Sequence, residues 1–252
     1  MLRALIERLR QKHRTMKFPA AAAPPLPERF RGMPLFDPAA CAADINALSA
    51  ACPTAAISSS PSGPRLDLGR CLFCADCPAA SRTGAVSFTS DFHLAARDRD
   101  VLVLDGTPRE FDAALPSALL GLFGRSLKLR QVSAGGCNAC EADINVLSTV
   151  GWDLARFGIQ IVASPRHADG LLVTGPVTNN MRLALEKTYA AVPSPKIVIA
   201  CGACAISGGP YAGHGEVAGG IADILPVDLY IPGCPPHPLT ILDALLRMLT
   251  RA

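Results

Sequence analysis

The C-terminal half of the sequence predicts an α/β domain, a parallel sheet covered by helices on both faces. From Lys128 onward, short apolar runs rich in β-branched residues alternate with longer helical patterns. Strands that alternate with helices in this way are typical of parallel sheets. Ten cysteines are the second observation, because they form two groups separated by the cysteine-free residues 78–136. This gap predicts two domains.

Composition and charge restrict the class of protein. Half of the 252 residues are apolar and the mean hydropathy is +0.29, which indicates either apolar surface kept for partners or a well-packed Ala-rich domain. The net charge of +3 is too small to predict nucleic-acid binding. No apolar run reaches the roughly 18 to 20 residues that cross a bilayer, and no signal peptide is evident. We therefore expect a chain in a reducing compartment, where clustered thiols indicate metal or redox chemistry.

Residues 1–33 predict a basic amphipathic helix followed by a Pro-rich linker. Leu2, Leu5, Ile6 and Leu9 recur at helical spacing, and the segment up to Gly32 has eight Lys or Arg against two Glu. Such a helix can lie on an anionic membrane or dock on a partner. A frayed, solvated terminus is the alternative. The linker AAAAPPLPERFRGMP has little reason to fold alone.

Residues 34–97 predict a small turn-rich domain with a three-cysteine run, CLFCADC. A bacterial two-cluster ferredoxin has two such runs, and the last cysteine of each run ligates the other cluster. In this chain the first run keeps Cys41 and Cys52, but Asp44 and Ala47 stand among its lost middle positions, and Ser81 replaces the last cysteine of the second run. The segment looks like a half-degenerate ferredoxin domain.

Swapped ligation predicts one 4Fe–4S cluster in this segment and the absence of the other. The predicted ligands are Cys52, Cys71, Cys74 and Cys77. A relic domain with no cluster, or with zinc, is the alternative. Short extended pieces, AAIS and AVSF, follow the two cysteine groups, and residues 98–127 form a connector to the second half.

The strands of residues 128–252 place cysteines in the loops that follow them. LRQVS, IQIV, GLLVTG, KIVIA and VDLYI are the expected strands, and helices are expected at about 141–156, 178–191 and 237–250. Loops after strand carboxyl ends hold the chemistry of such sheets. These loops read SAGGCNAC, ACGACA and PGCPP. No GxGxxG or GxxxxGK[ST] motif indicates a nucleotide site.

Spacing alone leaves two interpretations of the C-terminal cysteines open. An iron–sulfur cluster fits because Gly135, Gly136, Gly202 and Gly233 let backbone N–H groups approach cluster sulfurs. A structural zinc site also fits, since two CxxC pairs are available. The cysteines concerned are Cys137, Cys140, Cys201, Cys204 and Cys234. We expect Cys201, which closes a strand, to be a buried thiol.

Four motifs carry a family resemblance: GGCNACE, SPRHADGLLVTGPVTNNM, CGACAISGG and VDLYIPGCPPHP. Residues from about Leu127 to Leu249 resemble the small subunit of membrane-bound group 4 nickel–iron hydrogenases of the formate hydrogenlyase type, and the homologous B-type subunit of NADH:quinone oxidoreductase (complex I). The resemblance implies a flavodoxin-like sheet with one 4Fe–4S cluster on Cys137, Cys140, Cys204 and Cys234. The complex I branch has adjacent cysteines where this chain has CxxC, which favours the hydrogenase branch. The N-terminal segment is similar to the polyferredoxin-type subunits of these complexes.

Three other side chains are candidates for the site. Glu141 follows a cysteine and opens a helix, so it can relay protons or only satisfy the helix dipole. Arg166 and His167 lie in the turn before GLLVTG. We expect Arg166 to bind the cluster or a partner's active-site loop and His167 to couple protonation to reduction, although a lone histidine in a turn is more often simply solvated.

The sequence therefore predicts an electron-transfer subunit of an oxidoreductase complex, with two 4Fe–4S clusters and no complete active site of its own. The resemblance implies a hydrogenase large subunit as partner, or a subunit like the 49-kDa subunit of complex I, with further ferredoxin-type and membrane subunits. It also implies a peripheral position on the cytoplasmic face of the plasma membrane, held by partners or by the N-terminal helix. A quinone-reducing subunit and a structural zinc protein are the alternatives.

Overall fold

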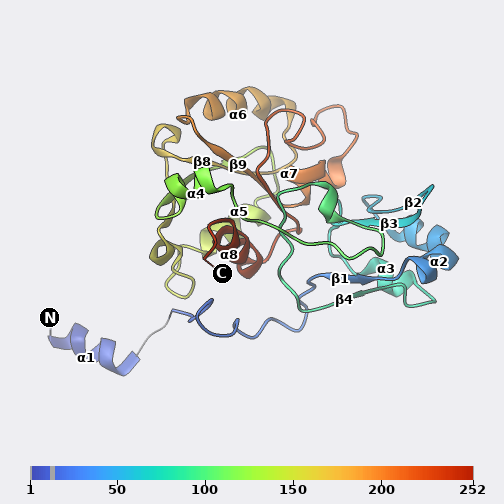
Figure 1. The fold of residues 1–252 in the computed structure, drawn as a ribbon, viewed down its shortest axis with the longest axis horizontal. Coiled ribbons are helices and arrows are strands. Elements are labelled where there is room, and N and C mark those ends of the chain that lie inside the picture. The colour runs from blue at the N-terminus through green and yellow to red at the C-terminus, as the bar shows by residue number, and fades with distance from the viewer. Residues whose placement is uncertain (1, 12–14, 252) are drawn as a thin grey trace.

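The computed structural model describes residues 2–11 and 15–251. An N-terminal helix is joined through an extended arm to a small α+β unit, and the larger α/β unit follows (Figure 1). Within the described residues, no helix is both long enough and apolar enough to span a bilayer.

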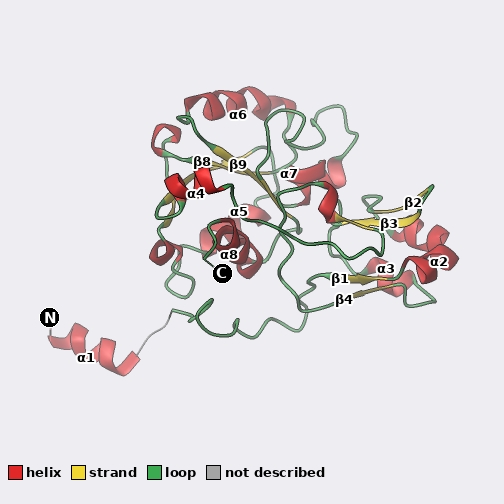
Figure 2. Cartoon of the chain, viewed as in Figure 1, coloured by secondary structure: helices red, strands yellow, loops and turns green. Residues whose placement is uncertain are grey.

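A five-stranded parallel sheet forms the centre of the α/β unit (Figure 2). The strands lie in the order β10-β9-β8-β6-β7, and all neighbouring pairs are parallel. Counted from the first strand of the unit, this is the flavodoxin-like order 2-1-3-4-5, which confirms the predicted fold class. The strands are β6 (Leu127–Ser133), β7 (Ile159–Ile161), β8 (Gly170–Thr174), β9 (Ile197–Cys201) and β10 (Leu229–Ile231).

Helices cover both faces of this sheet, as predicted. Successive residues of a strand point to opposite faces, so Leu171 and Val173 of β8 belong to one core and Leu172 belongs to the other. The first core includes residues of α6 and α7, and the second includes residues of α4, α5 and α8. The helices are α4 (Ser117–Phe123), α5 (Ala139–Val146), α6 (Asn179–Ala191), α7 (Ala203–Ser207) and α8 (Pro238–Met248).

The helix expected over residues 141–156 is wrong in its extent. Helix α5 ends at Val146, and a separate 3-10 turn, η2, covers Leu154–Phe157. The residues between them include Ser148, Thr149 and Gly151, which are weak helix formers. Asp153 then takes a positive φ of 47°, which a helix does not allow. The other two expected helices match α6 and α8 to within two residues.

The N-terminal unit repeats a strand–helix pattern twice. Strand β1 pairs antiparallel with β4, and β2 forms a hairpin with β3. Each half contributes one helix between its strands. The elements are β1 (Pro34–Phe36), α2 (Pro38–Ala51), β2 (Ile57–Ser60), β3 (Gly63–Asp67), α3 (Asp76–Ala80) and β4 (Val86–Phe88). The extended pieces expected after each cysteine group are β2 and β4.

Helix α2 is longer than a turn-rich segment predicts. Asp37 caps it, because its Oδ1 accepts hydrogen bonds from the backbone N–H groups of Ala39 at 2.9 Å and Ala40 at 3.1 Å. Pro38 occupies the first helical position, where its missing N–H costs nothing. Alanine, the strongest helix former, then fills much of the helix. The cap, the proline and the alanines together explain why this segment is helical.

The connector binds the two units together. After the 3-10 turn η1 (Asp100–Leu102), strand β5 (Val103–Leu104) pairs with β3 of the N-terminal unit. One continuous core joins Leu48 and Leu66 of that unit to Leu171 of the sheet. The hydroxyl of Ser207 in α7 donates a hydrogen bond of 2.9 Å to the carbonyl of Gly69. The two units therefore share a packed interface.

The Pro-rich linker is ordered against the α/β unit. Met16 N–H donates to the carbonyl of Gly151 at 2.9 Å, and Arg156 donates to the carbonyls of Met16 and Phe18. The Phe18 side chain is buried and meets Phe92 edge to face, with ring centroids 5.8 Å apart. These contacts hold the arm in place without regular structure.

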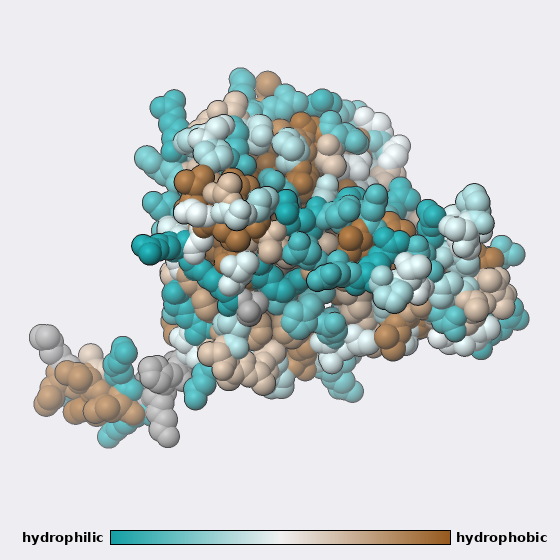
Figure 3. All heavy atoms as spheres, viewed as in Figure 1, coloured by the Kyte–Doolittle hydropathy of each residue, from teal (hydrophilic) through white to brown (hydrophobic). Residues whose placement is uncertain are grey.

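The predicted amphipathic helix is present as α1 (Leu2–Gln11). Residues 2–10 of the helix are exposed, including the apolar side chains, which are brown in Figure 3. Of the segment 1–33 predicted as helix and linker, residues 1 and 12–14 lie outside the described residues. The exposed apolar residues are Leu2, Leu5, Ile6 and Leu9.

Candidate metal centres

The four N-terminal cysteines predicted as ligands lie around one small cavity. Cys71, Cys74 and Cys77 lie on the loop and first turn of α3, and Cys52 ends α2. All four line a small cavity whose other walls include Ile57, Leu66 and Phe88. The backbone N–H of Ala56 donates to Cys52 Sγ at 3.1 Å, and that of Phe73 donates to Cys71 Sγ at 3.3 Å. The swapped combination of Cys52 with the later run is therefore brought together.

This site stabilises neutral thiols unless a cation is present. Burial raises the pKa of Cys71 to about 12, and neighbouring cysteines add to the shift. Burial likewise raises the pKa of Cys77 to about 12, with Cys74 and Cys52 as the next contributors. Four clustered thiolates need positive charge among them, which the iron ions of a cluster supply. The enclosed, thiol-lined cavity fits such a group.

Asp44, which stands at one of the middle positions where the first run has no cysteine, is the centre of a hydrogen-bonded network. Its carboxylate is buried in α2, and its Oδ2 accepts hydrogen bonds from Arg82 N–H at 2.7 Å and Thr83 N–H at 2.9 Å. The hydroxyls of Ser81 and Thr83 also donate to it. Burial raises the pKa of Asp44, but these hydrogen bonds outweigh it and hold the pKa below its usual value. The carboxylate thus connects α2 to residues 81–83. Cys41 lies fully buried three residues away.

The C-terminal cysteines lie in loops and helix starts at the carboxyl edge of the sheet. Cys137 and Cys140 follow β6, Cys204 follows β9, and Cys234 follows β10. Cys140 is in the first turn of α5 and Cys204 in the first turn of α7, where helix N–H groups favour thiolates. Parallel strands bring these positions to one edge. The expected loop position of Cys204 is therefore a short helix.

Burial and the charges of neighbouring thiols raise the pKa values of Cys140, Cys204 and Cys234. Burial raises the pKa of Cys204 to about 11, and Cys234 and Cys137 contribute further. Burial also raises the pKa of Cys140 strongly, followed by Glu141, Cys204 and Cys234. Such mutual effects require the four groups to lie close together. As at the first site, thiolates here need a cationic partner.

Glycines leave space beside two of these sulfurs. A Cβ built on Gly202 would lie 2.7 Å from Cys140 Sγ, and one on Gly209 would lie 2.7 Å from Cys204 Sγ. Gly202 was expected in this role, whereas Gly209 was not identified. Gly135 instead approaches Thr178, and the other two predicted glycines approach Gly175 and Pro236. The backbone space beside the sulfurs fits a cluster that accepts N–H hydrogen bonds.

Glu141 is buried beside the C-terminal cysteines. Thr174, at the end of β8, donates its hydroxyl to Glu141 Oε1 at 2.6 Å. Burial raises the pKa of Glu141, but hydrogen bonds from Ser133 and Thr174 outweigh this, so the pKa lies below its usual value. The group is thus a fixed negative charge at neutral pH. Sequence reasoning did not identify Ser133 or Thr174, although both end strands whose following loops line the site.

Arg166 and His167 do not lie near the C-terminal cysteines, and that part of the prediction is wrong. Both belong to the 3-10 turn η3 (Pro165–His167), which precedes β8. Because β8 is parallel to β6, with Gly170 beside Leu129 and Thr174 beside Ser133, residues before β8 lie at the opposite edge from residues after β6. They line a pocket together with Lys128 and Pro193–Pro195. A contact of Arg166 or His167 with a partner stays a prediction.

The two cysteine groups are neighbours. Cys234 has its pKa raised by burial first, then by Cys137, and then by Cys74 of the N-terminal group. Leu72 and Phe73 line the same pocket as Gly233 and Cys234. Cys201, by contrast, is fully buried at the end of β9, as expected. Among the described residues, no three His, Cys, Asp or Glu side chains converge closely enough to hold a single metal ion.

Comparisons with known proteins agree with this site. The profile of the family described as NADH ubiquinone oxidoreductase, 20 Kd subunit, matches residues 137–248, a range that includes all four C-terminal cysteines. Formate hydrogenlyase subunit 7 of Escherichia coli is 44% identical over 145 residues, which are 58% of this chain and 57% of that protein.

Two further relatives cover about half of the chain. The probable membrane-bound hydrogenase subunit mbhJ of Pyrococcus furiosus is 42% identical over 53% of this chain and 80% of its own length. The B-type subunit of NADH-quinone oxidoreductase from Bacteroides thetaiotaomicron is 45% identical over 46% of this chain and 59% of its own length. The chain thus spans less than two thirds of the E. coli and Bacteroides relatives. By its matched residues, this chain belongs to the NADH ubiquinone oxidoreductase 20 kDa subunit family, whose named relatives are subunits of oxidoreductase complexes.

Proposed function

We propose that this chain is an electron-transfer subunit that holds two 4Fe–4S clusters and exchanges electrons with a nickel–iron site on a partner large subunit of a membrane-associated hydrogenase complex. The observation that supports this most is the neighbouring position of the two cysteine groups, since Leu72 and Phe73 of the N-terminal run line the same pocket as Gly233 and Cys234. A one-electron relay needs carriers placed in sequence.

Each proposed cluster has four cysteine ligands on this chain. When bound, such clusters supply one-electron redox chemistry. The chain's own part is to hold the thiolates, exclude water and set the local charge. Glu141 adds a buried negative charge beside the C-terminal group. The proposed sets are Cys52, Cys71, Cys74 and Cys77 for the first cluster, and Cys137, Cys140, Cys204 and Cys234 for the second.

The second ferredoxin cluster is absent in this proposal. Asp44 Oδ2 accepts four hydrogen bonds from residues 81–83, and Oδ1 lies 3.6 Å from Arg82 Nε, so both carboxylate oxygens already have partners. The middle cysteines of the first run are missing, because residues such as Asp44 and Ala47 stand in their places. Cys41 therefore lacks the neighbouring thiols that a second cluster would need. The N-terminal unit would therefore be a single-cluster carrier.

Membrane attachment through α1 is part of the proposal. Leu2 and Leu9 are each 75% exposed, and Arg3, Arg8 and Arg10 share the helix with them. A basic amphipathic helix of this kind binds anionic lipid through apolar burial and charge attraction. Flotation of the whole protein with vesicles containing phosphatidylglycerol should be lost in Leu5→Gln/Leu9→Gln but kept in Leu183→Gln, which alters an exposed leucine of α6. Equal flotation of all three proteins would contradict this attachment.

Purification of the tagged chain from membranes under anaerobic conditions tests the hydrogenase assignment. The expected result is a nickel-containing partner, with reduction of both clusters by hydrogen gas seen by electron paramagnetic resonance (EPR). The matched variant Cys204→Ser should still assemble but should fail to transfer electrons from hydrogen to the N-terminal cluster. A complex without nickel that neither consumes nor evolves hydrogen would refute the assignment.

A quinone-reducing subunit is the second candidate. The 45% identity to the B-type subunit of a bacterial NADH-quinone oxidoreductase favours it. The same purified complex separates the two candidates, because a quinone-reducing complex would be oxidised by added quinone and would not respond to hydrogen. A response to hydrogen alone would reject this candidate.

A further inference from the structure

Helix α8 has a line of polar residues on an otherwise buried, apolar helix. His237, Thr240, Asp243 and Arg247 are spaced by three, three and four residues, which places them on one side of the helix. Thr240 and Asp243 are each only 1% exposed. Burial of polar groups without a partner is costly, so such a line needs a structural or chemical reason.

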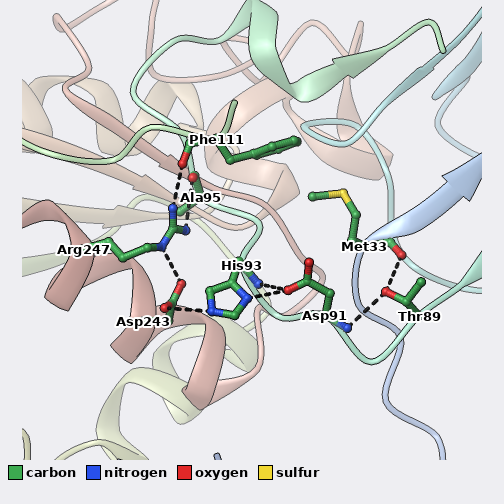
Figure 4. Close-up of polar contacts among 8 residues, drawn as sticks. All are labelled: Met33, Thr89, Asp91, His93, Ala95, Phe111, Asp243 and Arg247. Carbon is green, nitrogen blue, oxygen red and sulfur yellow. Dashed lines mark hydrogen bonds and ion pairs between the residues drawn. The ribbon is translucent and has the colours of Figure 1, made fainter. Parts of the chain in front are cut away.

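The outer end of this line reaches solvent through a histidine between two carboxylates (Figure 4). His93 Nδ1 lies 2.5 Å from Asp91 Oδ1, and His93 Nε2 lies 3.6 Å from Asp243 Oδ1. The side chains of Asp91 and His93 are about half exposed, at 47% and 49%. His93 therefore presents one ring nitrogen toward an exposed carboxylate and the other toward a buried one.

The buried end of the line has two polar atoms without hydrogen-bond partners among the described residues, Asp243 Oδ1 and Thr240 Oγ1. They lie one helical turn apart on the same side of α8. Thr240 also lines the pocket that contains Gly233, Cys234 and His237. Buried atoms of this kind normally pair with water or with each other through a shared water molecule.

Arg247 fixes the other carboxylate oxygen of Asp243. Its Nε donates to Asp243 Oδ2 at 2.8 Å, and its remaining nitrogens donate to the carbonyls of Phe111 and Ala95. Figure 4 shows this arrangement, with Oδ1 left facing His93. Arg247 thereby orients Asp243 so that only one oxygen is available for proton exchange.

We propose that Asp91, His93 and Asp243 form a proton relay between solvent and the buried Asp243 carboxylate, on the side of α8 that continues to the pocket beside the Cys234 loop. His93 takes up a proton at Nδ1, on the side of Asp91, and releases a proton from Nε2 to Asp243 Oδ1. Protonated Asp243 holds the proton at Oδ1, one helical turn from Thr240, and returns it to His93 Nε2 when the pH rises. Each step moves one proton and leaves every group able to reset.

The charges that face Asp243 are compatible with protonation. Burial raises the pKa of Asp243, Arg247 and His93 act in the opposite direction, and Asp91 adds to the rise. These are the groups on α8 and on the segment 91–93 packed against it. The relay would move protons beside the electron carriers, so its role in electron transfer rests on the proposed function. The proton movement itself does not depend on that function.

The test follows protonation of Asp243 directly in the whole protein, with or without iron. After a rapid pH jump, infrared spectroscopy monitors the carboxyl band that is missing in Asp243→Asn. In His93→Ala the band should respond roughly 100-fold more slowly, the scale of a lost acid–base group. Added imidazole should restore the rate, which a purely structural role would not allow. His214→Ala, which changes an exposed histidine, should behave like the unaltered protein.

Thr240→Val decides the direction of the path. It keeps the shape of Thr240 and removes the hydroxyl, so the response of Asp243 to the jump should be unchanged if protons arrive through His93. An equal slowing in Thr240→Val and His93→Ala would show that protons arrive from the pocket, and would overturn the assigned order. An unchanged rate in His93→Ala, or no rescue by imidazole, would overturn the relay. Absence of clusters would refute the proposed function without affecting these outcomes.

Discussion

Replacement of Gly202 by alanine should remove the C-terminal cluster while leaving the fold in place. Gly202 joins β9 to α7 with φ 93° and ψ 155°, a conformation found almost only in glycine. Its N–H donates to the Ile231 carbonyl at 2.8 Å, which fixes the backbone. A new Cβ would lie 2.7 Å from Cys140 Sγ. The sulfur would have to move away from the position of a ligand.

The size of the effect follows from these two features. A side chain in this backbone region costs about 1–3 kcal/mol, which lowers the free energy of unfolding by that amount. The Gly233 carbonyl oxygen at 3.6 Å and Pro236 Cδ at 3.7 Å limit how far the new methyl group can retreat. The new methyl group therefore also displaces Cys140 Sγ. This displacement weakens cluster binding, whereas the backbone cost lowers the free energy of unfolding.

Chemical denaturation and iron analysis measure the two effects separately. Gly202→Ala should lose the signal of one cluster by EPR and keep the other. Gly121→Ala is the matched control, because Gly121 lies within α4 and a Cβ there meets nothing within 4 Å. In a helix this exchange should be neutral or stabilise the protein by up to about 1 kcal/mol. Full iron content and unchanged stability in Gly202→Ala would refute the reasoning.

Three further predictions concern the N-terminal unit and α8. The pKa of Asp44 is lowered in the folded state, so the ionised carboxylate stabilises the fold at pH values above its ordinary pKa of 3.8, and this stabilisation is lost as the pH falls through the lower folded pKa. Asp44→Asn should be less stable at neutral pH. Denaturation at a series of pH values should show that the variant lacks this acid-dependent loss. Cys52→Ala should lose the N-terminal cluster, whereas Cys41→Ala should keep it; equal iron content in both variants would contradict the ligand assignment. Arg247→Met should lower the free energy of unfolding by about 3–5 kcal/mol at neutral pH, because it removes the arginine partner of the buried Asp243 carboxylate. The loss should be smaller in acid, where Asp243 is protonated. An equal loss at both pH values would count against this cause.

The sequence was sufficient to predict the sheet and the positions of its cysteines. Each of the runs ending at Ser133, Cys201 and Ile231 is short, apolar and followed by a loop, and parallel strands bring such loops to one edge. The same rule predicts where Arg166 and His167 must lie. They precede β8, so they belong to the opposite edge of the sheet from the cysteines.

Other features depend on contacts that no local pattern indicates. Asp44 was recognised as a residue at a lost cysteine position, but its hydrogen bonds to residues 81–83 span nearly forty positions of sequence. Gly209 approaches Cys204 only because α7 turns back after five residues. The pairing of His93 with Asp243 joins residues 150 positions apart. These are products of tertiary packing rather than of local propensity.

Iron and acid-labile sulfide per chain, measured on anaerobically prepared protein together with EPR during stepwise reduction, tests the central claim most directly. The account predicts about eight irons and eight sulfides per chain, from two 4Fe–4S clusters, with two distinct signals that broaden each other because Cys74 and Cys234 are neighbours. About four irons would reduce the N-terminal unit to a scaffold. Zinc without iron would contradict the account.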